Sequence, residues 1–374
     1  MTRVCHVLDD AITWEHRVGL AHLVDRLPPH EYTHRMLAPA PVLPRLTAGL
    51  DRPVEQTPIP FTRSLPSGLF FAHHARRRFF DVIHAWGVGA AAAARLAGGH
   101  LPLIAQLDDP ALSDKDLKLL RSIGRQRGFA ITCSSQIIRR RLIEGGVPAD
   151  VIVVIRPGVD FAAINRWRRG PLRRELGIGP DERVVLLTEP VTVSGGHFEA
   201  FRAASLRAYL VDDHRIVVPG ASREQARIAR YNASLPGSVG LVSPGAGVPF
   251  EQLVAVSDVM LMAPRGDCPT TAIAWAMGAR VGVVGTAVRA IAELIAHKLN
   301  GLLVKPERAK SIVKSLAAAL ADRTSLAKTI ETAHGQAYEI FSIRRYTEYT
   351  ARLYHNVIEG LPADHGIVDT ATVA

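Results

Sequence analysis

The chain has 374 residues, of which 48% are hydrophobic and 21% are charged. This composition indicates a globular protein and excludes a disordered one, and the length favours two domains over one. The three cysteines lie far apart and form no CxxC pair, which excludes a zinc knuckle or a disulfide framework and suits a reducing compartment. A net charge of +10 indicates a small anionic substrate, nucleic acid or a membrane face as partner, unless it serves solubility alone.

No apolar run approaches the roughly 18 residues that a membrane-spanning helix needs, and the first residues do not have the pattern of a signal peptide. We therefore expect a cytoplasmic protein. Residues 69–82 combine phenylalanines with three successive arginines. Such a helix either packs its rings on a sheet or lies on an anionic membrane surface. Residues 137–146 allow the same two interpretations, so peripheral attachment to the inner face of the membrane stays open as an expectation.

Short β-branched runs alternate with helical stretches in the first half of the chain. Strand-like runs cover residues 4–10, 81–86, 101–109, 129–135 and 151–158. A helical pattern follows the first run at 15–27, and another follows the second and ends at Gly98 and Gly99. Strands that alternate with helices predict right-handed crossovers and a mainly parallel sheet. The pattern predicts an N-terminal Rossmann-like domain over residues 1–165.

An arginine-rich stretch then interrupts the pattern and predicts a linker over residues 166–182. The alternation restarts with strand-like runs at 183–190, 214–220, 238–245, 256–264 and 280–285, and with helical runs at 196–209 and from residue 270. We expect a second Rossmann-like domain over 183–340, a helix over 341–360 and a frayed tail over 361–374. In doubly wound sheets, ligands bind beyond the carboxyl ends of the strands, so the residues that follow each strand are the candidates for a site.

The segment GDCPTTAIAWAMGA (266–279) places Asp267 and Trp275 eight residues apart, after a strand and across the start of a helix. Other motifs are VIVVIRPGVD (151–160), VPFEQLVAVSDVMLMAP (248–264), VRAIAELIAHKLNGLLVKP (288–306) and FSIRRYTEYTARLYHNVI (341–358). In this order, and over almost the whole chain, these motifs resemble the family 4 glycosyltransferases of the GT-B type.

The resemblance implies an α/β protein of the GT-B type. Its two Rossmann-like, doubly wound parallel-sheet domains would face a central cleft, and the helix over 341–360 would cross back to the N-terminal domain. It also implies a hexosyltransferase that moves a sugar from a nucleotide-sugar donor to a sugar, glycan or lipid-linked acceptor, with retention of the anomeric configuration. The nucleotide-sugar is a substrate, so we expect no cofactor.

By the resemblance, Asp267 faces the donor sugar as the catalytic carboxylate. Trp275 stands where the family has a second carboxylate for the ribose hydroxyls. An indole can only donate a hydrogen bond, so Trp275 either stacks on a base or sugar face or fills the core. Glu189 and Ser194 stand near the family's Arg and Lys, which neutralise the donor diphosphate. The donor-binding residues that we expect are Ser194, Gly195, Gly196, Gly220, Arg265, Pro269, Thr270, Thr271 and Trp275.

Two of these positions have a direct physical rationale. The glycine pair allows backbone amides to approach a phosphate near a helix N-terminus, and Arg265 follows a strand, where it either reaches an anionic group or is solvated. On the acceptor side we expect Asp9, Trp14, His84, Trp86 and Asp108. Trp86 and Asp108 stand where the family tends to carry histidines, and the first loop lacks the family's glycine pair. These departures leave an alternative function open, a catalytically impaired relative that binds a glycan, a nucleotide or a protein.

Other site classes have weaker support. Residues 87–95, with Asp108 about twenty residues later, mimic a dinucleotide fingerprint. Small residues are common in alanine-rich helices, so we do not expect a nicotinamide cofactor. The paired acids form no Asp-x-Asp clamp, and the pair His73–His74 lacks companions at ligand spacing, so we expect no metal. Only the net charge favours nucleic acid, without the basic and aromatic motif of a known module, so we expect no nucleic-acid partner.

Overall fold

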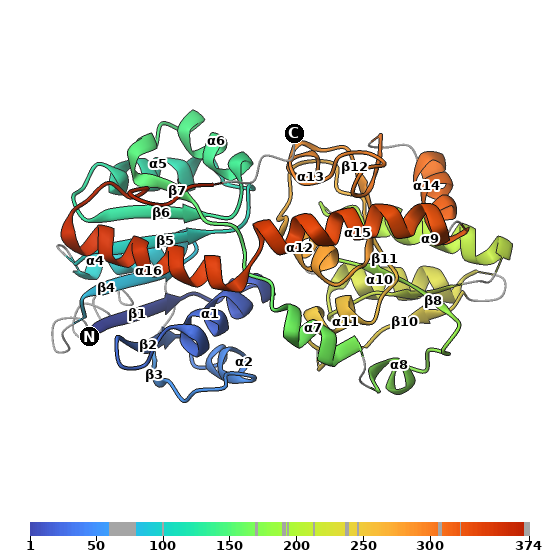
Figure 1. Cartoon of the computed structure of the whole chain (residues 1–374), viewed down its shortest axis with the longest axis horizontal. Coiled ribbons are helices and arrows are strands. Elements are labelled where there is room, and N and C mark those ends of the chain that lie inside the picture. The colour runs from blue at the N-terminus through green and yellow to red at the C-terminus, as the bar shows by residue number, and fades with distance from the viewer. Residues whose placement is uncertain are drawn as a thin grey trace. The chain divides into compact units, whose positions relative to one another are not determined.

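In a computed structural model of the chain, the structure describes residues 1–59, 80–98, 101–168, 171–188, 192, 194–211, 214–235, 239–244, 247–305, 309–321 and 323–369. The chain divides into two compact units, each built on its own sheet (Figure 1). The N-terminal unit comprises Met1–Gly158 and Ile343–Thr370, and the C-terminal unit is built on Val159–Ser342.

The N-terminal sheet has seven strands in the order β3-β2-β1-β4-β5-β6-β7, and all neighbours are parallel. The strands are β1 (Thr2–Leu8), β2 (Tyr32–Ala38), β3 (Glu55–Pro58), β4 (Val82–Trp86), β5 (Leu103–Leu107), β6 (Phe129–Cys133) and β7 (Ile152–Val154). The chain order reverses between β1 and β4. In doubly wound sheets this reversal marks, at the carboxyl edge, the place where ligands bind.

Helices cover both faces of the N-terminal sheet. Helices α1 (Trp14–Arg26), α2 (Leu43–Thr47) and α16 (Ile343–Glu359) pack on one face, and α4 (Val88–Gly98), α5 (Asp114–Gly124) and α6 (Gln136–Glu144) pack on the other. Strand residues alternate between the two apolar layers, so that Ile83 lies under α4 and Trp86 lies under α1 and α16. Ser113 and Asp116 form a capping box that fixes the start of α5, and a 3₁₀ turn (Ala149–Val151) leads into β7.

The C-terminal sheet has six parallel strands in the order β10-β9-β8-β11-β12-β13. They are β8 (Arg183–Leu187), β9 (His214–Val217), β10 (Leu241–Val242), β11 (Val259–Met262), β12 (Gly282–Thr286) and β13 (Leu302–Val304). The order reverses between β8 and β11, so this unit too is doubly wound, with its ligand-binding position after these two strands.

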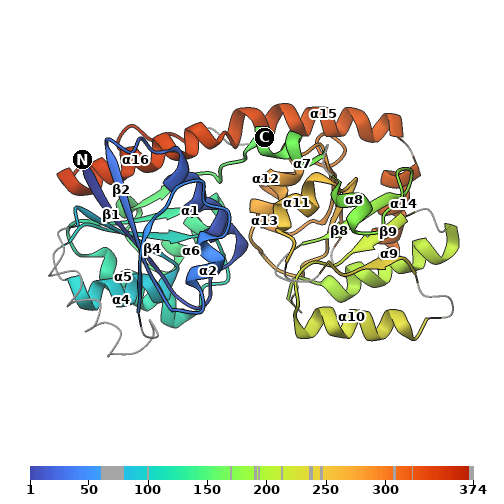
Figure 2. The ribbon, with the colours of Figure 1, turned by 90° about the horizontal axis from the view of Figure 1, so that it is seen from below.

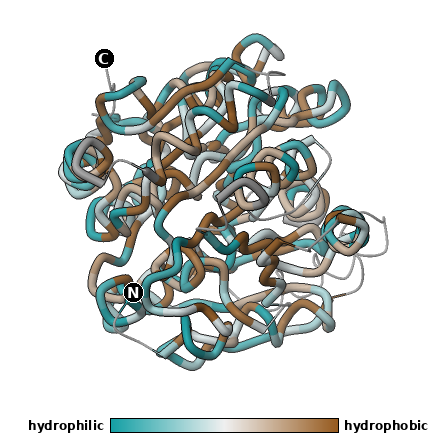
Figure 3. The backbone as a smooth tube through the Cα atoms, turned by 90° about the vertical axis from the view of Figure 1, so that its right-hand side faces the viewer, coloured by the Kyte–Doolittle hydropathy of each residue, from teal (hydrophilic) through white to brown (hydrophobic). Residues whose placement is uncertain are grey.

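The helices of the C-terminal unit lie on both faces of its sheet (Figure 2). One face carries α9 (His197–Val211), α10 (Arg223–Ala233) and α14 (Ala309–Ala321), and the other carries α11 (Phe250–Ala255), α12 (Thr271–Gly278) and α15 (Arg323–Ile340). Shorter helices are α7 (Phe161–Arg168), α8 (Leu172–Glu175) and α13 (Arg289–Ala292). In Figure 3 the helices alternate between hydrophilic and hydrophobic colours along their turns, as helices do that cover a sheet on one side.

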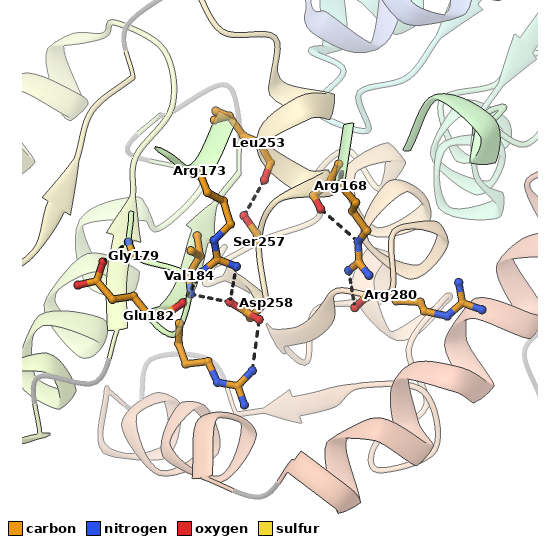
Figure 4. Close-up of polar contacts among 11 residues, drawn as sticks. Arg168, Arg173, Gly179, Glu182, Val184, Leu253, Ser257, Asp258 and Arg280 are labelled. Carbon is orange, nitrogen blue, oxygen red and sulfur yellow. Dashed lines mark hydrogen bonds and ion pairs between the residues drawn. The ribbon is translucent and has the colours of Figure 1, made fainter. Parts of the chain in front are cut away.

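The amino edge of the C-terminal sheet is held by Asp258, which directly precedes β11 (Figure 4). Its carboxylate accepts hydrogen bonds from the backbone N–H of Val184 at 2.8 Å and from Arg183 Nη1 at 3.2 Å, and Arg173 Nη1 lies 3.7 Å away. Nearby, Arg168 donates to the carbonyls of Ala255 and Arg280, at 3.2 Å each. These contacts fasten α7 to α11 and to the turn before β12, and they fasten the segment around α8 to the sheet. Much of the segment expected as a linker is therefore bound to the C-terminal unit.

The sequence correctly predicted two α/β domains with parallel sheets, and the doubly wound fold class is confirmed. It did not predict β2, β3 or β13. The expectation of a frayed tail is wrong for residues 361–369, because Ala363 and Ile367 are buried in the core under α16 and Asn356 donates to the carbonyls of Ala363 and His365.

Some expectations lie outside the described residues. Most of the amphipathic segment 69–82 does, as do Glu189 and the pair His73–His74. None of the described helices combines the length and the apolar character needed to cross a lipid bilayer.

Candidate functional site

The loop after β8 is pressed against the end of β11 at the carboxyl edge of the C-terminal sheet. Gly196 has φ +66°, and a Cβ at this position would lie 1.8 Å from the carbonyl oxygen of Ala263. Only glycine fits both the left-handed backbone and the close approach. Its carbonyl accepts the N–H of Ala200 at 2.9 Å in the first turn of α9. The N-terminus of α9, whose first amides have no partner within the helix, therefore lies at this edge, and such a terminus favours an anion.

His197, which the sequence analysis missed, fixes the shape of this loop. Its Nδ1 lies 2.9 Å from the carbonyl oxygen of Thr192, and its Nε2 lies 3.1 Å from Oγ1 of Thr188. Burial lowers the pKa of His197, which suits a neutral ring that donates through one nitrogen and accepts through the other. A Cβ on Gly195 would lie 2.2 Å from this ring, so glycine lets the imidazole fold back under the loop. Ser194 Oγ shares a hydrogen bond with Thr192 Oγ1 at 3.3 Å.

Two arginines follow neighbouring strands at the same edge. Arg265, after β11, donates to Glu199 in the first turn of α9 at 2.9 Å. Arg289, after β12, donates to Asp267 through Nε at 3.1 Å and through Nη2 at 2.7 Å, and Asp267 also accepts the N–H of Ala290 at 3.0 Å. Both guanidinium groups are largely exposed, at 65% and 70% of their side chains. The edge therefore carries two accessible cations, and Asp267 orients one of them.

Other expected donor residues have different surroundings. Pro269 is half-buried in the turn that leads to α12, and Thr270 is buried just before that helix. Thr271 Oγ1 is buried without a hydrogen-bond partner among the described residues. Gly220 follows β9, the neighbour of β8, with φ +70°. All four follow strands or precede a helix at the carboxyl edge, where we expected them.

Trp275 does not face this edge openly. Its side chain is only 1% exposed and stacks on Trp167 of α7, with ring centroids 6.2 Å apart and planes inclined by 25°. In this geometry the indole fills the core between α12 and α7, and its ring face is not offered to a base. Of the two interpretations that the sequence left open, the structure favours the core.

At the carboxyl edge of the N-terminal sheet, three ionisable residues converge. Asp108, just after β5, accepts a hydrogen bond from Gln106 Nε2 at 2.8 Å, and its Oδ2 lies 3.7 Å from Nε2 of His16 on α1. Burial raises the pKa of Asp108. Burial also lowers the pKa of His16, although the neighbouring carboxylates of Asp108 and Asp9 act to raise it. Asp9 accepts the N–H of Ala11 at 2.9 Å. Trp14, the first residue of α1, is buried.

His84 and Trp86 lie deeper than we expected for acceptor contacts. Their rings stack at 4.5 Å, Trp86 Nε1 donates to His6 Nδ1 at 3.2 Å, and His84 Nδ1 lies 2.8 Å from the hydroxyl of Tyr354. His6 in turn bonds His34 at 2.9 Å. Burial lowers the pKa of His84 to about 3 and that of His34 to about 4. These side chains form a neutral polar layer between the sheet and α16. The layer lies beneath the residues at the carboxyl edge of the N-terminal sheet and packs against them.

The expected site residues therefore separate into three groups. One edge carries Ser194, Gly195, Gly196, Gly220, Arg265, Asp267, Pro269, Thr270 and Thr271, the other carries Asp9, Trp14 and Asp108, and the interior holds Trp275, His84 and Trp86. The sequence analysis missed His16, His197 and Arg289. The glycine pair directly before His197 was the one available signal, because the other two gain their roles from contacts with residues far away in the sequence. Among the described residues, no group of three or more His, Cys, Asp or Glu side chains could hold a metal ion.

Two family models match the chain. The model described as Glycosyltransferase Family 4 matches residues 17–163, and the model described as Glycosyl transferases group 1 matches residues 198–322. The chain belongs to the family 4-like glycosyltransferases. The chain is therefore a glycosyltransferase, and the family recognised from its motifs is confirmed.

Solved structures share the fold of this glycosyltransferase. A glycosyltransferase from Rickettsia africae covers 96% of the chain and 99% of its own length at 16% identity, with a TM-score of 0.79. HepE of Anabaena in complex with UDP-glucose covers 95% and 100% at 18% identity, with a TM-score of 0.80. WaaG, a glycosyltransferase involved in lipopolysaccharide biosynthesis, covers 96% and 100% at 13% identity, with a TM-score of 0.72. These likenesses confirm the GT-B fold, and no curated protein sequence matches the chain.

Proposed function

We propose that this glycosyltransferase binds its nucleotide-sugar at the carboxyl edge of the C-terminal sheet and transfers the sugar with retention of configuration. The observation that carries the proposal is the contact between Gly196 and Ala263, which holds the N-terminus of α9 at the end of β11. Backbone amides at that terminus suit the oxygens of a diphosphate. This geometry supports the anion site that the sequence motifs implied, with different side chains around it.

The diphosphate charge would be balanced by Arg265 and Arg289, in place of the Arg and Lys that the family carries in the loop after β8. Negative charge grows on the leaving phosphate as the glycosidic bond breaks, so cations held beside it stabilise the transition state. Asp267 would have two roles, orienting Arg289 through its bonded oxygens and accepting a hydroxyl of the donor sugar with its remaining lone pairs.

The acceptor hydroxyl would bind at the carboxyl edge of the N-terminal sheet, where Asp108 accepts its hydrogen bond and His16 positions Asp108. In a retaining transfer of this kind, the acceptor oxygen forms the new bond to the anomeric carbon as the bond to the phosphate oxygen breaks, and the leaving phosphate takes the hydroxyl proton. No protein nucleophile is required. Asp108 and His16 contact only the reacting hydroxyl in this proposal. Contacts with the rest of the acceptor would select its class, whether sugar, glycan or lipid-linked.

The first test is donor binding measured by thermal shift. We would use UDP-glucose, which HepE binds, with UDP, GDP, ADP and their common sugar conjugates. A nucleotide at a hundredfold over its Kd adds about 2.7 kcal/mol of stability, so a true donor gives a clear shift. Arg265→Ala and Arg289→Ala should each weaken that binding by about tenfold or more, because each removes charge-assisted hydrogen bonds to phosphate. Arg344→Ala, which removes an exposed guanidinium paired with Glu348, is the matched control.

The second candidate function, a catalytically impaired binding protein, is favoured by one observation. The indole of Trp275 is buried against Trp167, where the family would place a carboxylate for the ribose. If no nucleotide shifts the unfolding of well-folded protein, the donor proposal is refuted and this second function gains. If a nucleotide binds without sugar transfer to any acceptor tested, the protein is a nucleotide-binding relative.

A further inference from the structure

The last described residue of the C-terminal tail, Asp369, contacts a buried arginine at the carboxyl edge of the N-terminal sheet. Arg156, just after β7, donates to Asp369 through Nε at 3.0 Å to one carboxylate oxygen and through Nη2 at 2.9 Å to the other. Gln136 Nε2 donates to the same carboxylate at 2.7 Å. The side chains of Arg156 and Asp369 are 5% and 12% exposed. Donors from two separate segments thus converge on one carboxylate.

The residues that hold this carboxylate come from loops that follow strands. Gln136 opens α6 after β6, Arg156 follows β7, and Arg156 Nη1 lies 3.5 Å from the carbonyl oxygen of Ser134. All three lie at the carboxyl edge of the sheet, beyond the ends of β6 and β7. A planar guanidinium with a neighbouring amide donor matches phosphate as well as carboxylate geometry, because both present paired oxygens to its fork. The pocket therefore has the chemistry of an anion site, filled by the protein's own side chain.

The tail that supplies Asp369 is attached by a limited set of contacts. After α16 the chain turns back past β7 (Figure 1). Ala363 and Ile367 are buried, and Asn356 and Arg352 donate to tail carbonyls. Between these anchors, Pro362, Asp364 and His365 are exposed. Among the described residues, the contact of Asp369 with Arg156 is thus the attachment of the tail that lies nearest the C-terminus.

We infer that Arg156 and Gln136 form an anion-binding pocket for a phosphate group, and that the C-terminal tail closes this pocket with Asp369. A buried guanidinium without an anion is costly, so the tail and a phosphate compete for one site. Two ligands that exclude one another in this way are coupled reciprocally, so phosphate releases the tail and the tail weakens phosphate. The net charge of +10 fits a protein that meets phosphate-bearing ligands. The inference concerns the N-terminal unit alone and does not depend on donor binding.

The test compares phosphate binding in variants of the full chain. Asp369→Asn keeps the shape of the side chain but removes the competing charge, so it should bind inorganic phosphate at least about tenfold more tightly than the wild type by calorimetry. Asp364→Asn, which neutralises an exposed carboxylate of the same tail, should bind like the wild type. The double variant Arg156→Gln with Asp369→Asn should lose the gain. If Asp369→Asn binds phosphate no better than Asp364→Asn does, the contact merely fastens the tail and the inference fails.

A second measurement uses the wild type and so does not depend on whether a variant folds. Hydrogen exchange of the tail amides, such as the N–H of Ile367 bonded to the carbonyl of Asp364, should speed up at saturating phosphate. Unchanged exchange under phosphate that measurably binds would overturn the competition. Vesicles of phosphatidylcholine with and without phosphatidic acid identify the source of the phosphate. Sedimentation of Asp369→Asn with the acidic vesicles, abolished in the double variant, assigns it to a lipid headgroup, and binding of inorganic phosphate alone assigns it to a soluble ligand.

Discussion

The carboxyl edges of the two sheets are built from different chemistry. At the N-terminal edge, Asp9, His16 and Asp108 are at least nine-tenths buried. Burial lowers the pKa of His16 and raises the pKa of Asp108, and both shifts favour the neutral form of the side chain. At the C-terminal edge the loop after β8 offers glycine backbone, while the side chains of Arg265 and Arg289 are largely exposed. The N-terminal edge therefore holds titratable side chains that are shielded from water, and the C-terminal edge holds guanidinium groups that are exposed to water.

This difference shows what each edge can bind. Holding a charge out of water is costly, so the N-terminal edge gains most from a ligand that forms neutral hydrogen bonds, such as a hydroxyl. A helix N-terminus with nearby guanidinium groups favours an anion. An acceptor on the first unit and a diphosphate on the second agree with these preferences. The exception is the pocket around Arg156, where the N-terminal unit does hold an anion, supplied by its own tail.

The largest expected effect tests the acceptor edge. Asp108→Asn should lower kcat by about a hundredfold while donor Kd stays unchanged, because the amide orients the acceptor hydroxyl poorly and a small misplacement of a reacting group can cost about a hundredfold in rate. Initial rates at saturating donor and a donor titration separate the two quantities. Asp109→Asn is the matched control, since this adjacent carboxylate is exposed and accepts the N–H of Ala111. Wild-type kcat in Asp108→Asn would remove Asp108 from the proposed site.

The next effect tests the donor edge through its backbone. Gly196→Ala adds a Cβ that would lie 1.8 Å from the Ala263 carbonyl, at φ +66°. The C-terminal unit should lose about 2–4 kcal/mol of unfolding free energy from strain and overpacking, and donor binding should weaken as the start of α9 shifts. The N-terminal unit should keep its stability, which hydrogen exchange resolved by residue can follow.

Gly247→Ala provides the control for the glycine substitution. A Cβ at position 247 meets nothing within 4 Å, so the unfolding free energy should change by less than about 0.5 kcal/mol. If Gly196→Ala proves as harmless as Gly247→Ala, then the loop after β8 is not held against β11 as the structure has it. The donor proposal would then lose the contact that carries it.

The sequence was sufficient for the fold class, although not for β2, β3 or β13, because the fold class depends on local patterns. Apolar runs such as those of β4 and β11 alternate with helical stretches, and that alternation alone predicts parallel sheets. The tail shows the limit of this reasoning. Its composition resembles that of a frayed end, but Ala363 and Ile367 find a core that is formed by α16 and the sheet. Because residues 361–369 are buried by segments far away in the sequence, these nine residues show no hydrophobic periodicity that would reveal their burial.

The candidate site was predictable only where a motif carries it. The glycine pair and Arg265 were proposed from the sequence because they stand at fixed distances from predicted strands, and the structure places them at one edge. Arg289 and His16 were missed because their importance comes from Asp267 and Asp108, their partners 22 and 92 residues away. Trp275 was recognised as a departure, yet the sequence could not decide between stacking on a ligand and packing on Trp167, since both need an aromatic ring in the same place.

The smallest effect distinguishes the units by pH. His84 and His34 have pKa values lowered by burial to about 3 and about 4. The unfolded chain binds protons at these histidines below about pH 6.5 while the folded chain does not, so stability present above that pH is lost as pH falls. From pH 7 to pH 5 each such histidine costs about 2 kcal/mol. Asp108, whose pKa is raised, acts in the opposite direction and offsets part of this loss.

The N-terminal unit should therefore be the acid-sensitive one. It contains His6, His16, His34 and His84, all with lowered pKa values, whereas in the described part of the C-terminal unit His197 is the one histidine with such a shift. Hydrogen exchange at pH 7 and pH 5, resolved by unit, measures the difference. His84→Gln should reduce the loss in the N-terminal unit by about 2 kcal/mol, and His355→Gln, at an exposed position of α16, should leave it unchanged. Equal acid sensitivity in the two units would mean that the histidine layer is hydrated and titrates freely, and the support that it gives to the acceptor edge would have to come from packing alone.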